Sequence, residues 1–259
     1  MHSHINFGYP NSIIYGHLLV TAAALPLVLL AWFRKWSKWV LVPAAAIVLW
    51  SLTAFAIVRF GLDMNGRMSL PTQSFLASGT GRVLDMGAGS GRSAIMVLEA
   101  RPNCTLVALD LFGQSYEQHF GTDGKKQDVT EIGRERLLAN FRIAGVDQRA
   151  SIQPGDMRHM PLEPASFDAI VSAYAIDHLG ANGAKESLAE AARVLKPKGE
   201  FLLMVITKDA WLNYAWGPLL MHAGMRGAGR WTELLNEAGF DVVEQGTRPA
   251  TLYFLARKR

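Results

Sequence analysis

The stretch Val83-Leu-Asp-Met-Gly-Ala-Gly-Ser-Gly91 decides the fold of this 259-residue chain. It completes a short apolar run, Arg82–Asp85, that predicts a buried strand. Three glycines at alternate positions then permit a tight turn, and a helical pattern begins at Ser93. A strand that turns through glycines into a helix is typical of the first unit of an alternating α/β fold.

Strand and helix patterns alternate after this turn. Further strands are predicted at Thr105–Asp110, Ser151–Gln153, Ala169–Ser172, Phe201–Ile206, Phe240–Gln245 and Thr251–Arg257, and helices at Ser93–Ala100, Arg134–Ala144 and Ala184–Leu195. The last two strands follow each other without a helix, so we expect an antiparallel hairpin at one edge. The predicted fold is a doubly wound, mostly parallel seven-stranded sheet that binds ligands at the carboxyl ends of its strands.

Two uncharged apolar runs, Ile13–Phe33 and Trp39–Val58, precede the glycine-rich turn. As helices, each reaches about 30 Å, the thickness of the hydrocarbon core of a bilayer. No Asp or Glu occurs before Asp63, and long helices without a polar face do not suit the surface of a soluble domain. We therefore predict a two-helix membrane hairpin, with helices at about 13–33 and 39–60.

The basic excess of the chain lies in the same region. The formal net charge is +4, and the first 60 residues hold four of the 26 basic residues and no acidic one. The remaining 22 basic residues balance 22 acidic residues, so the downstream part is neutral. Basic side chains beside apolar helices suit anionic headgroups, which favours membrane lipids over nucleic acid as a partner.

The topology of the hairpin stays open. A cleavable signal sequence is disfavoured, because Met1-His-Ser-His4 carries no Lys or Arg and a second apolar run follows the first. Two full spans with a cytoplasmic domain would place Arg34–Lys38 outside, against the positive-inside tendency. Pro26 and Pro43 can bend the helices, so a hairpin that re-enters one leaflet is the alternative. We expect an integral or monotopic membrane protein whose catalytic domain faces the cytoplasm.

These patterns divide the chain into a hairpin at 1–62, a linker with a leading helix at 63–78, and one α/β domain at 79–259. The single Cys104 excludes an internal disulfide and a cysteine-based metal cluster, and no metal site is expected. The oligomeric state does not follow from the sequence.

Several ordered motifs of the α/β domain resemble those of the class I S-adenosylmethionine-dependent methyltransferases. Asp85-Met-Gly-Ala-Gly-Ser-Gly91 is similar to that family's acidic-x-Gly-x-Gly-x-Gly loop, where the backbone approaches the methionine part of the cofactor. Asp110 ends the second strand, where the family places a carboxylate that accepts both ribose hydroxyls. Asp156 and Met157 follow the third strand, where the family contacts the adenine amino group and ring.

The resemblance extends over about residues 79–258, because Ser166–Ser172 and Arg193–Glu200 are similar to the family's fourth strand and its turn into the fifth. It implies S-adenosyl-L-methionine as the cofactor. The implied cofactor-binding residues are Asp85, Gly87, Ala88, Gly89, Gly91, Asp110, Leu111, Asp156, Met157 and Ser172.

Two related functions fit the motifs less well. A dinucleotide-binding dehydrogenase has Gly-x-Gly-x-x-Gly, whereas here the third glycine comes one residue early and the carboxylate of Asp85 would repel a pyrophosphate. Family members that methylate nucleobase or amide nitrogens usually have Asn/Asp-Pro-Pro-Tyr/Phe after the fourth strand. This chain has Ser172-Ala-Tyr-Ala175 there, which disfavours that branch.

Three regions are candidates for the acceptor side. Tyr174, Asp177 and His178 follow the fourth strand, and the imidazole of His178 is a candidate base for a thiol or alcohol, unless it only packs locally. Tyr116 and His119 belong to a lid or to a solvated loop. An apolar stretch after the fifth strand is predicted to rest on the membrane, to line a lipophilic pocket, or to fill the core; its members are Trp211, Tyr214, Trp216, Met221, His222 and Met225.

The sequence therefore predicts a membrane-anchored methyltransferase that acts on a lipid or another lipophilic small molecule, at oxygen, sulfur or nitrogen. Anchoring confines an enzyme to the surface in which such acceptors dissolve. The alternative is a membrane-tethered scaffold or sensor that binds S-adenosylmethionine without catalysis. Intact cofactor positions do not discriminate between the two.

Overall fold

The computed structural model describes residues 4–112, 127–217 and 225–259, which form two compact units. One, the α/β unit, contains residues 4–7 and the described parts of 67–207 and 224–259. The other, the hairpin unit, contains residues 8–66 and the described part of 208–223. The division thus differs from the one expected from sequence at both ends of the hairpin, and it adds a short segment that follows the fifth strand.

Seven strands of the described residues form one sheet in the order β3-β2-β1-β4-β5-β7-β6. The strands are β1 (Thr80–Met86), β2 (Asn103–Asp110), β3 (Ala150–Pro154), β4 (Phe167–Ala173), β5 (Leu195–Ile206), β6 (Phe240–Arg248) and β7 (Thr251–Lys258). β1 to β5 pair in parallel, and β7 pairs antiparallel with β5 and β6. The predicted mostly parallel sheet and its C-terminal antiparallel hairpin are confirmed.

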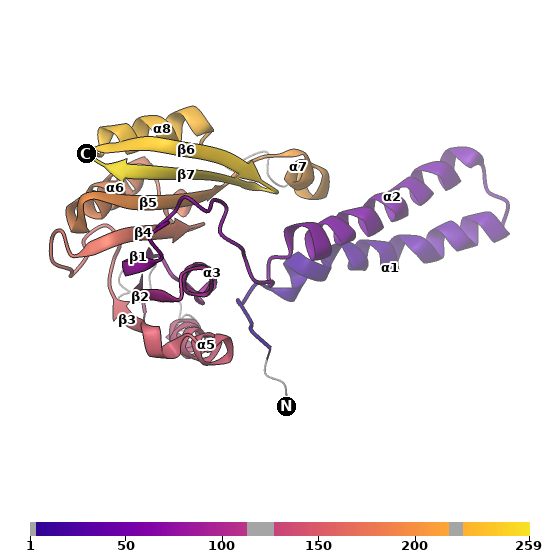
Figure 1. Ribbon diagram of the computed structural model, residues 1–259. Coiled ribbons are helices and arrows are strands. Elements are labelled where there is room, and N and C mark those ends of the chain that lie inside the picture. Colours follow the sequence, from indigo (N-terminus) through magenta and orange to yellow (C-terminus); the bar gives the residue numbers. More distant parts are fainter. Residues whose placement is uncertain (1–3, 113–126, 218–224) are drawn as a thin grey trace. The chain divides into compact units, whose positions relative to one another are not determined.

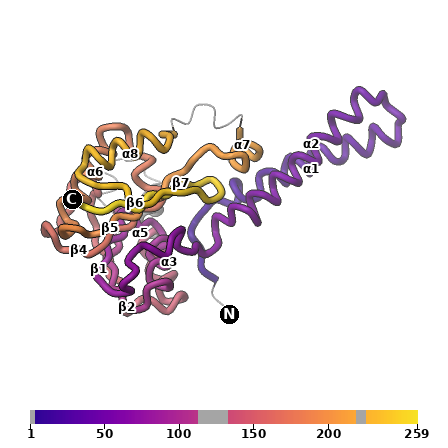
Figure 2. The backbone as a smooth tube through the Cα atoms, turned by 45° about the horizontal axis from the view of Figure 1, so that its top comes forward, coloured from indigo at the N-terminus to yellow at the C-terminus, as the bar shows by residue number. Residues whose placement is uncertain are grey.

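Helices cover both faces of this sheet. They are α3 (Arg92–Ala100), α5 (Gln127–Ala144), α6 (Ala181–Val194) and α8 (Ala228–Glu237), and Figures 1 and 2 show α6 and α8 on one face and α3 and α5 on the other. In α6, Ala184, Leu188 and Ala191 repeat at helical spacing and are fully buried. They pack with Trp231 of α8 against the sheet, and this cluster forms the core on that face of the sheet.

The order of the strands locates the ligand-binding edge. The chain places β2 and β3 on one side of β1, and β4 and β5 on the other, so the order reverses between β1 and β4. Open α/β sheets bind ligands outside the carboxyl ends of the strands at such a reversal. Because Asp85 of β1 is in register with Val171 of β4, the glycine-rich loop and the Ser172–Ala175 segment emerge side by side.

The leading helix expected in residues 63–78 is absent from the structure, where these residues form turns and irregular chain. The buried guanidinium of Arg101 donates to the backbone oxygens of Gln73, Phe75 and Leu76 at 2.7–3.0 Å. These long-range contacts hold the segment in its irregular path. Leu76 also has a φ of 48°, which a right-handed helix does not allow.

The hairpin unit contains α1 (Asn11–Phe33) and α2 (Lys38–Ala56), and α2 continues into the π-helix η1 (Ile57–Leu62). The two helices run side by side and are joined by a short turn (Figure 1). Both are long and apolar enough to cross a membrane, by length and composition. At most 17% of the apolar stretch of either helix is buried inside the protein. Leu19, Phe33 and Trp39 are 71%, 72% and 80% exposed. A hydroxyl pair, Thr21 and Ser51, joins the helices at 2.7 Å.

A short helix from the second half of the chain, α7 (Ala210–Trp216), packs on this hairpin. The indole N–H of Trp50 donates to the backbone oxygen of Tyr214, and Nε2 of His17 donates to that of Ala215, both at 2.9 Å. The last carbonyl groups of a helix have no partner within it, so the hairpin satisfies two of them. The hydroxyl of Thr53 also pairs with that of Tyr214 at 2.6 Å. The segment after β5 is therefore part of the hairpin unit.

Candidate functional site

The glycine-rich loop adopts a conformation that requires its glycines. Gly87, Gly89 and Gly91 have φ of 82°, 53° and 89°, in the left-handed region. A Cβ at Gly87 would lie 2.4 Å from Cβ of Ala175, and one at Gly91 would lie 2.5 Å from Cδ1 of Leu137. At Gly89 no heavy atom lies within 4 Å of that position. The first and third glycines are thus needed for protein packing, whereas the middle one faces open space that a ligand can approach.

Asp85 lies beneath this loop and is fully buried. The hydroxyl of Ser93, in the first turn of α3, donates to both carboxylate oxygens, at 2.9 and 2.7 Å. Burial raises the pKa of Asp85 to about 7, against the opposing hydrogen bond from Ser93, and the nearby charge of Asp110 raises it further. Asp85 therefore fixes the start of α3 relative to the end of β1, which orders the loop between them.

Asp110 lies at the carboxyl end of β2 beside the loop. Its Oδ2 accepts the N–H of Gly89 at 2.5 Å, and its Oδ1 accepts the N–H of Leu111 at 2.6 Å. Burial raises the pKa of this carboxyl group, and the two backbone N–H bonds oppose that rise. Each carboxylate oxygen has a second lone pair, so Asp110 can accept two further donors, as a pair of ribose hydroxyls requires.

Asp156 has a partner that the sequence analysis missed. The guanidinium of Arg158 pairs with it through Nη2 to Oδ2 at 2.8 Å, and Nε and the backbone N–H of Arg158 also donate to it. An Arg two residues after an Asp in a turn was the available signal. Cε of Met157 lies 2.8 Å from where a Cβ on Gly87 would be, so the thioether lies against the loop. The adenine contacts expected of Asp156 and Met157 remain predictions.

Polar side chains at the end of β4 and in the segment after it bond to neighbouring strands. The buried hydroxyl of Ser172 donates to the backbone oxygen of Met86 at 2.7 Å, which joins the ends of β4 and β1. Tyr174, with a φ of 55°, pairs its hydroxyl with that of Thr251 at 2.7 Å. Oδ2 of Asp177 accepts the N–H of Ile206 at 3.0 Å.

His178 ends the short 3₁₀ helix Ile176–His178 and is exposed to solvent. Oδ1 of Asp177, in the same turn, is buried and has no hydrogen-bond partner among the described residues. The three predicted acceptor-side residues thus lie in one segment at the expected edge. The side chains of Tyr174 and Asp177 are engaged with β7 and β5, whereas the imidazole is accessible.

The remaining acceptor-side candidates do not form one group. Tyr116, His119, Met221 and His222 lie outside the described residues. Trp211, Tyr214 and Trp216 are in the hairpin unit, whereas Met225 is in the α/β unit. That these residues rest on the membrane, line a lipophilic pocket or fill the core stays a prediction.

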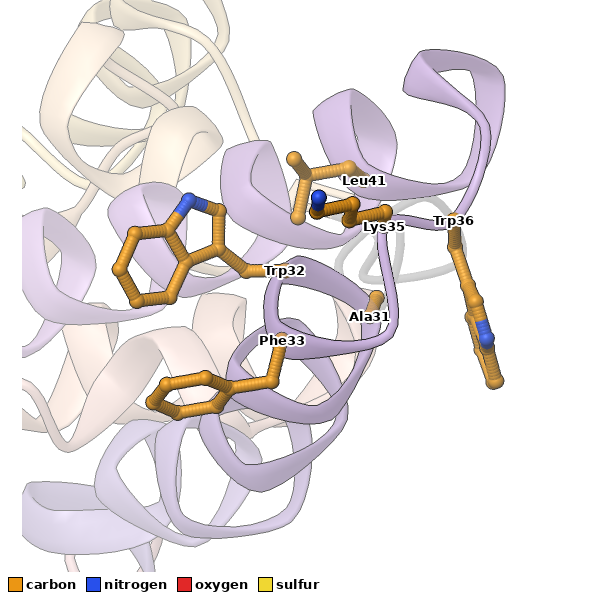
Figure 3. Close-up of a pocket in the computed structure, with 6 residues that line it drawn as sticks. All are labelled: Ala31, Trp32, Phe33, Lys35, Trp36 and Leu41. Atoms are coloured by element: carbon orange, nitrogen blue, oxygen red, sulfur yellow. The ribbon is translucent and has the colours of Figure 1, made fainter.

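A hollow of about 430 Å³ lies at the tip of the hairpin, lined by Ala31, Trp32, Phe33, Lys35, Trp36 and Leu41. In Figure 3 Trp32 and Phe33 point to the same side, whereas Trp36 points away from them. The lining has one cation and no carboxylate or imidazole, so it has no group suited to catalysis. Its aromatic rings beside a Lys are typical of side chains that settle at a membrane interface.

The donors and acceptors at the carboxyl edge of the sheet fit S-adenosylmethionine. The open backbone at Gly89 suits the methionine part, and the carboxylate of Asp110 suits the ribose. Residues 84–203 match the sequence family described as "Methyltransferase domain". The α/β unit therefore contains a methyltransferase domain, in residues 84–203.

Individual relatives agree with this assignment. A probable S-adenosylmethionine-dependent methyltransferase of Mycolicibacterium smegmatis is 34% identical over 161 residues, which cover 62% of this chain and 52% of the relative. The ubiquinone/menaquinone biosynthesis C-methyltransferase UbiE of Methylobacterium nodulans is 32% identical over 124 residues, 48% of this chain and 41% of that one. The chain spans about half the length of the curated relatives it matches.

Among solved structures, the mitomycin 7-O-methyltransferase MmcR shares the fold, with a TM-score of 0.56 at 16% identity over 86% of this chain and 59% of that one. The UbiE relative is named as a C-methyltransferase.

Proposed function

We propose that this chain is a membrane-anchored methyltransferase that transfers the methyl group of S-adenosylmethionine to a lipid or another lipophilic small molecule. The observation that carries the proposal is the pair of long apolar helices with exposed side chains in the same chain as the methyltransferase domain. Such helices are stable where lipid surrounds them, and lipophilic acceptors concentrate in the same phase.

The position of α7 supports a lipophilic acceptor. This helix follows β5, whose carboxyl end belongs to the ligand-binding edge, and its last carbonyl groups are satisfied by His17 and Trp50 of the hairpin. The chain thus leads from the cofactor edge directly into the apolar unit. The UbiE relative is named for ubiquinone and menaquinone biosynthesis, and the names of these products indicate a lipophilic quinone-type acceptor for that protein.

Within this proposal the residues of the chain bind, orient and deprotonate. The bound cofactor supplies a methyl group on a positively charged sulfur, which is already electrophilic. The backbone at Gly89 and the carboxylate of Asp110 hold the cofactor, and alignment of the acceptor with it provides most of the acceleration. His178 takes a proton from an acceptor hydroxyl or thiol. Asp177 positions the turn that carries His178 through its bond to the N–H of Ile206.

The test is transfer of labelled methyl groups from S-adenosylmethionine into a membrane extract by the full-length chain in lipid vesicles. We expect label in the organic phase, and mass spectrometry then identifies the acceptor atom as carbon, oxygen, sulfur or nitrogen. Asp110→Ala is the matched control, because it weakens cofactor binding and leaves the hairpin intact. Label confined to water-soluble products would refute a lipophilic acceptor.

The second candidate function is a membrane-tethered sensor or scaffold that binds S-adenosylmethionine without transferring its methyl group. Cofactor binding by calorimetry, combined with no transfer to any extract fraction, would favour it.

The orientation of the methyltransferase domain relative to the membrane is tested in the same vesicles or in cells. Because the cofactor is cytosolic, we expect protease added to the cytoplasmic side to cleave the methyltransferase domain.

A further inference from the structure

The segment that precedes the hairpin in the chain lies on the cofactor loop. Residues 4–7 belong to the α/β unit, although residue 8 begins the hairpin unit. Phe7 is only 6% exposed, and the guanidinium of Arg92, the first residue of α3, lies 5.9 Å from the centre of its ring. The hydroxyl of Ser90, within the glycine-rich loop, donates to the backbone oxygen of Phe7 at 2.7 Å.

Asn140 of α5 joins this segment to the same loop. Its side chain is 2% exposed and makes three hydrogen bonds. Nδ2 donates to the backbone oxygens of Asn6 at 2.9 Å and Ser90 at 2.8 Å, and Oδ1 accepts the N–H of Asn6 at 3.0 Å. An amide that pairs with both the N–H and the C=O of one residue and still donates to another needs two donors and one acceptor. Asp lacks the donors and Leu lacks all three groups.

The second half of the glycine-rich loop is held in place by these contacts. The first half is held by the sheet, because the N–H groups of Gly87 and Ala88 donate to the backbone oxygen of Leu109 at 2.9 and 3.0 Å. Gly89 is held by Asp110. At Ser90, both the hydroxyl and the backbone oxygen are bonded to groups outside the loop, namely Phe7 and Asn140.

We infer that residues 4–7 are a clasp that holds the glycine-rich loop in its cofactor-binding conformation, with Asn140 as the positioning residue. The clasp is continuous with the hairpin, since only Gly8, Tyr9 and Pro10 separate Phe7 from the first residue of α1. The role of the clasp in cofactor binding rests on the proposed function, whereas its contacts with the loop do not.

The experiment uses the full-length chain in lipid vesicles and compares Asn140→Leu with Thr72→Val. Thr72 is a matched control, because it is also a buried polar side chain that joins two segments, through Glu244 and the N–H of Ser74, away from the loop. We expect both variants to lower the melting temperature. Only Asn140→Leu should weaken binding of S-adenosylmethionine, by about tenfold, and Ser90→Ala should weaken it by a smaller factor.

Hydrogen exchange of the backbone amides of Gly89 to Gly91, measured without cofactor, tests the clasp independently of the proposed function. These amides should exchange about tenfold faster in Asn140→Leu than in Thr72→Val. Unchanged exchange in a folded Asn140→Leu variant, or unchanged affinity, would overturn the clasp. Failure of the native chain to bind cofactor would refute the proposed function instead, and the exchange rates would still decide the clasp.

Discussion

The helices of the hairpin and those of the methyltransferase domain differ in where their apolar side chains lie. In α8, Trp231, Leu234 and Leu235 are buried, and Arg230 and Glu233 pair on the exposed side. In α1 and α2, large apolar side chains are exposed around the helix, as at Leu19 and Leu49. The amphipathic pattern of α8 is that of a helix with water on one side, whereas the hairpin has no polar face for water. The proposed membrane anchoring depends on this difference.

The largest expected effect is on membrane retention. Arg in place of both Leu19 and Leu49, near the middles of the two helices, should cost about 5–7 kcal/mol of insertion free energy, because each charge near a bilayer centre costs about 2.5–3.5 kcal/mol. We expect the double variant to leave the membrane fraction after a high-salt wash. Val243→Arg, at an exposed apolar position of β6, is the matched control and should stay bound. Retention of the double variant in the membrane fraction would show that the exposed apolar side chains of the hairpin do not anchor the protein.

Substitution of His178 should abolish most catalysis while the protein stays bound to the membrane. If its imidazole takes a proton during transfer, His178→Ala should lower turnover by about 10²–10⁴-fold and leave cofactor affinity and membrane retention unchanged. His159→Ala, another exposed histidine of the domain, is the control. A loss of less than fivefold would make His178 structural, and alignment alone would then carry the reaction with an acceptor that arrives already ionised.

The stability of the methyltransferase domain should depend on pH through Asp85, whereas the chain before Asp63 contains no carboxylate side chain. The pKa of about 7 in the folded state exceeds the ordinary value of 3.8, so the native state binds more protons between these values. The free energy of unfolding therefore falls as pH rises, by roughly 2–3 kcal/mol between pH 5 and 8. Denaturant unfolding at both pH values should show this fall in the native chain and lose it in Asp85→Asn. An equal fall in Asp85→Asn and in the exposed control Asp241→Asn would exclude Asp85 as its source.

The smallest of these effects concerns cofactor affinity. Asp110→Ala removes a charged acceptor from a desolvated site, which costs roughly 1.5–3 kcal/mol, or ten- to a hundredfold in affinity. Calorimetry with S-adenosylmethionine measures it. Asp168→Ala is the control, because Asp168 is paired with Lys196 at the amino end of β4, remote from the cofactor edge. Unchanged affinity in Asp110→Ala would remove this residue from the cofactor site.

Features that depend on neighbouring residues were predicted from the sequence. The alternating strands and helices and the C-terminal antiparallel pair follow from hydrophobic period and turn residues, and the structure confirms them. The left-handed loop follows from its glycines. The leading helix at 63–78 was predicted wrongly: the stretch contains Gly66 and Pro71, and its backbone oxygens hold the guanidinium of the distant Arg101. The pairing of Asp156 with Arg158 was within reach of sequence reasoning and was overlooked.

The sequence by itself determined the kinds of elements, their order and the chemistry of the cofactor loop, since each depends on a few adjacent residues. Only the tertiary structure decided which distant segments meet. His17 reaches Ala215 across 198 positions of the chain, and Asn6 reaches Asn140 across 134. Such contacts form between groups that each have many possible partners, and they are selected by the packing of the whole unit rather than by any local pattern. The grouping of α7 with the hairpin, and of residues 4–7 with the cofactor loop, is decided at that level.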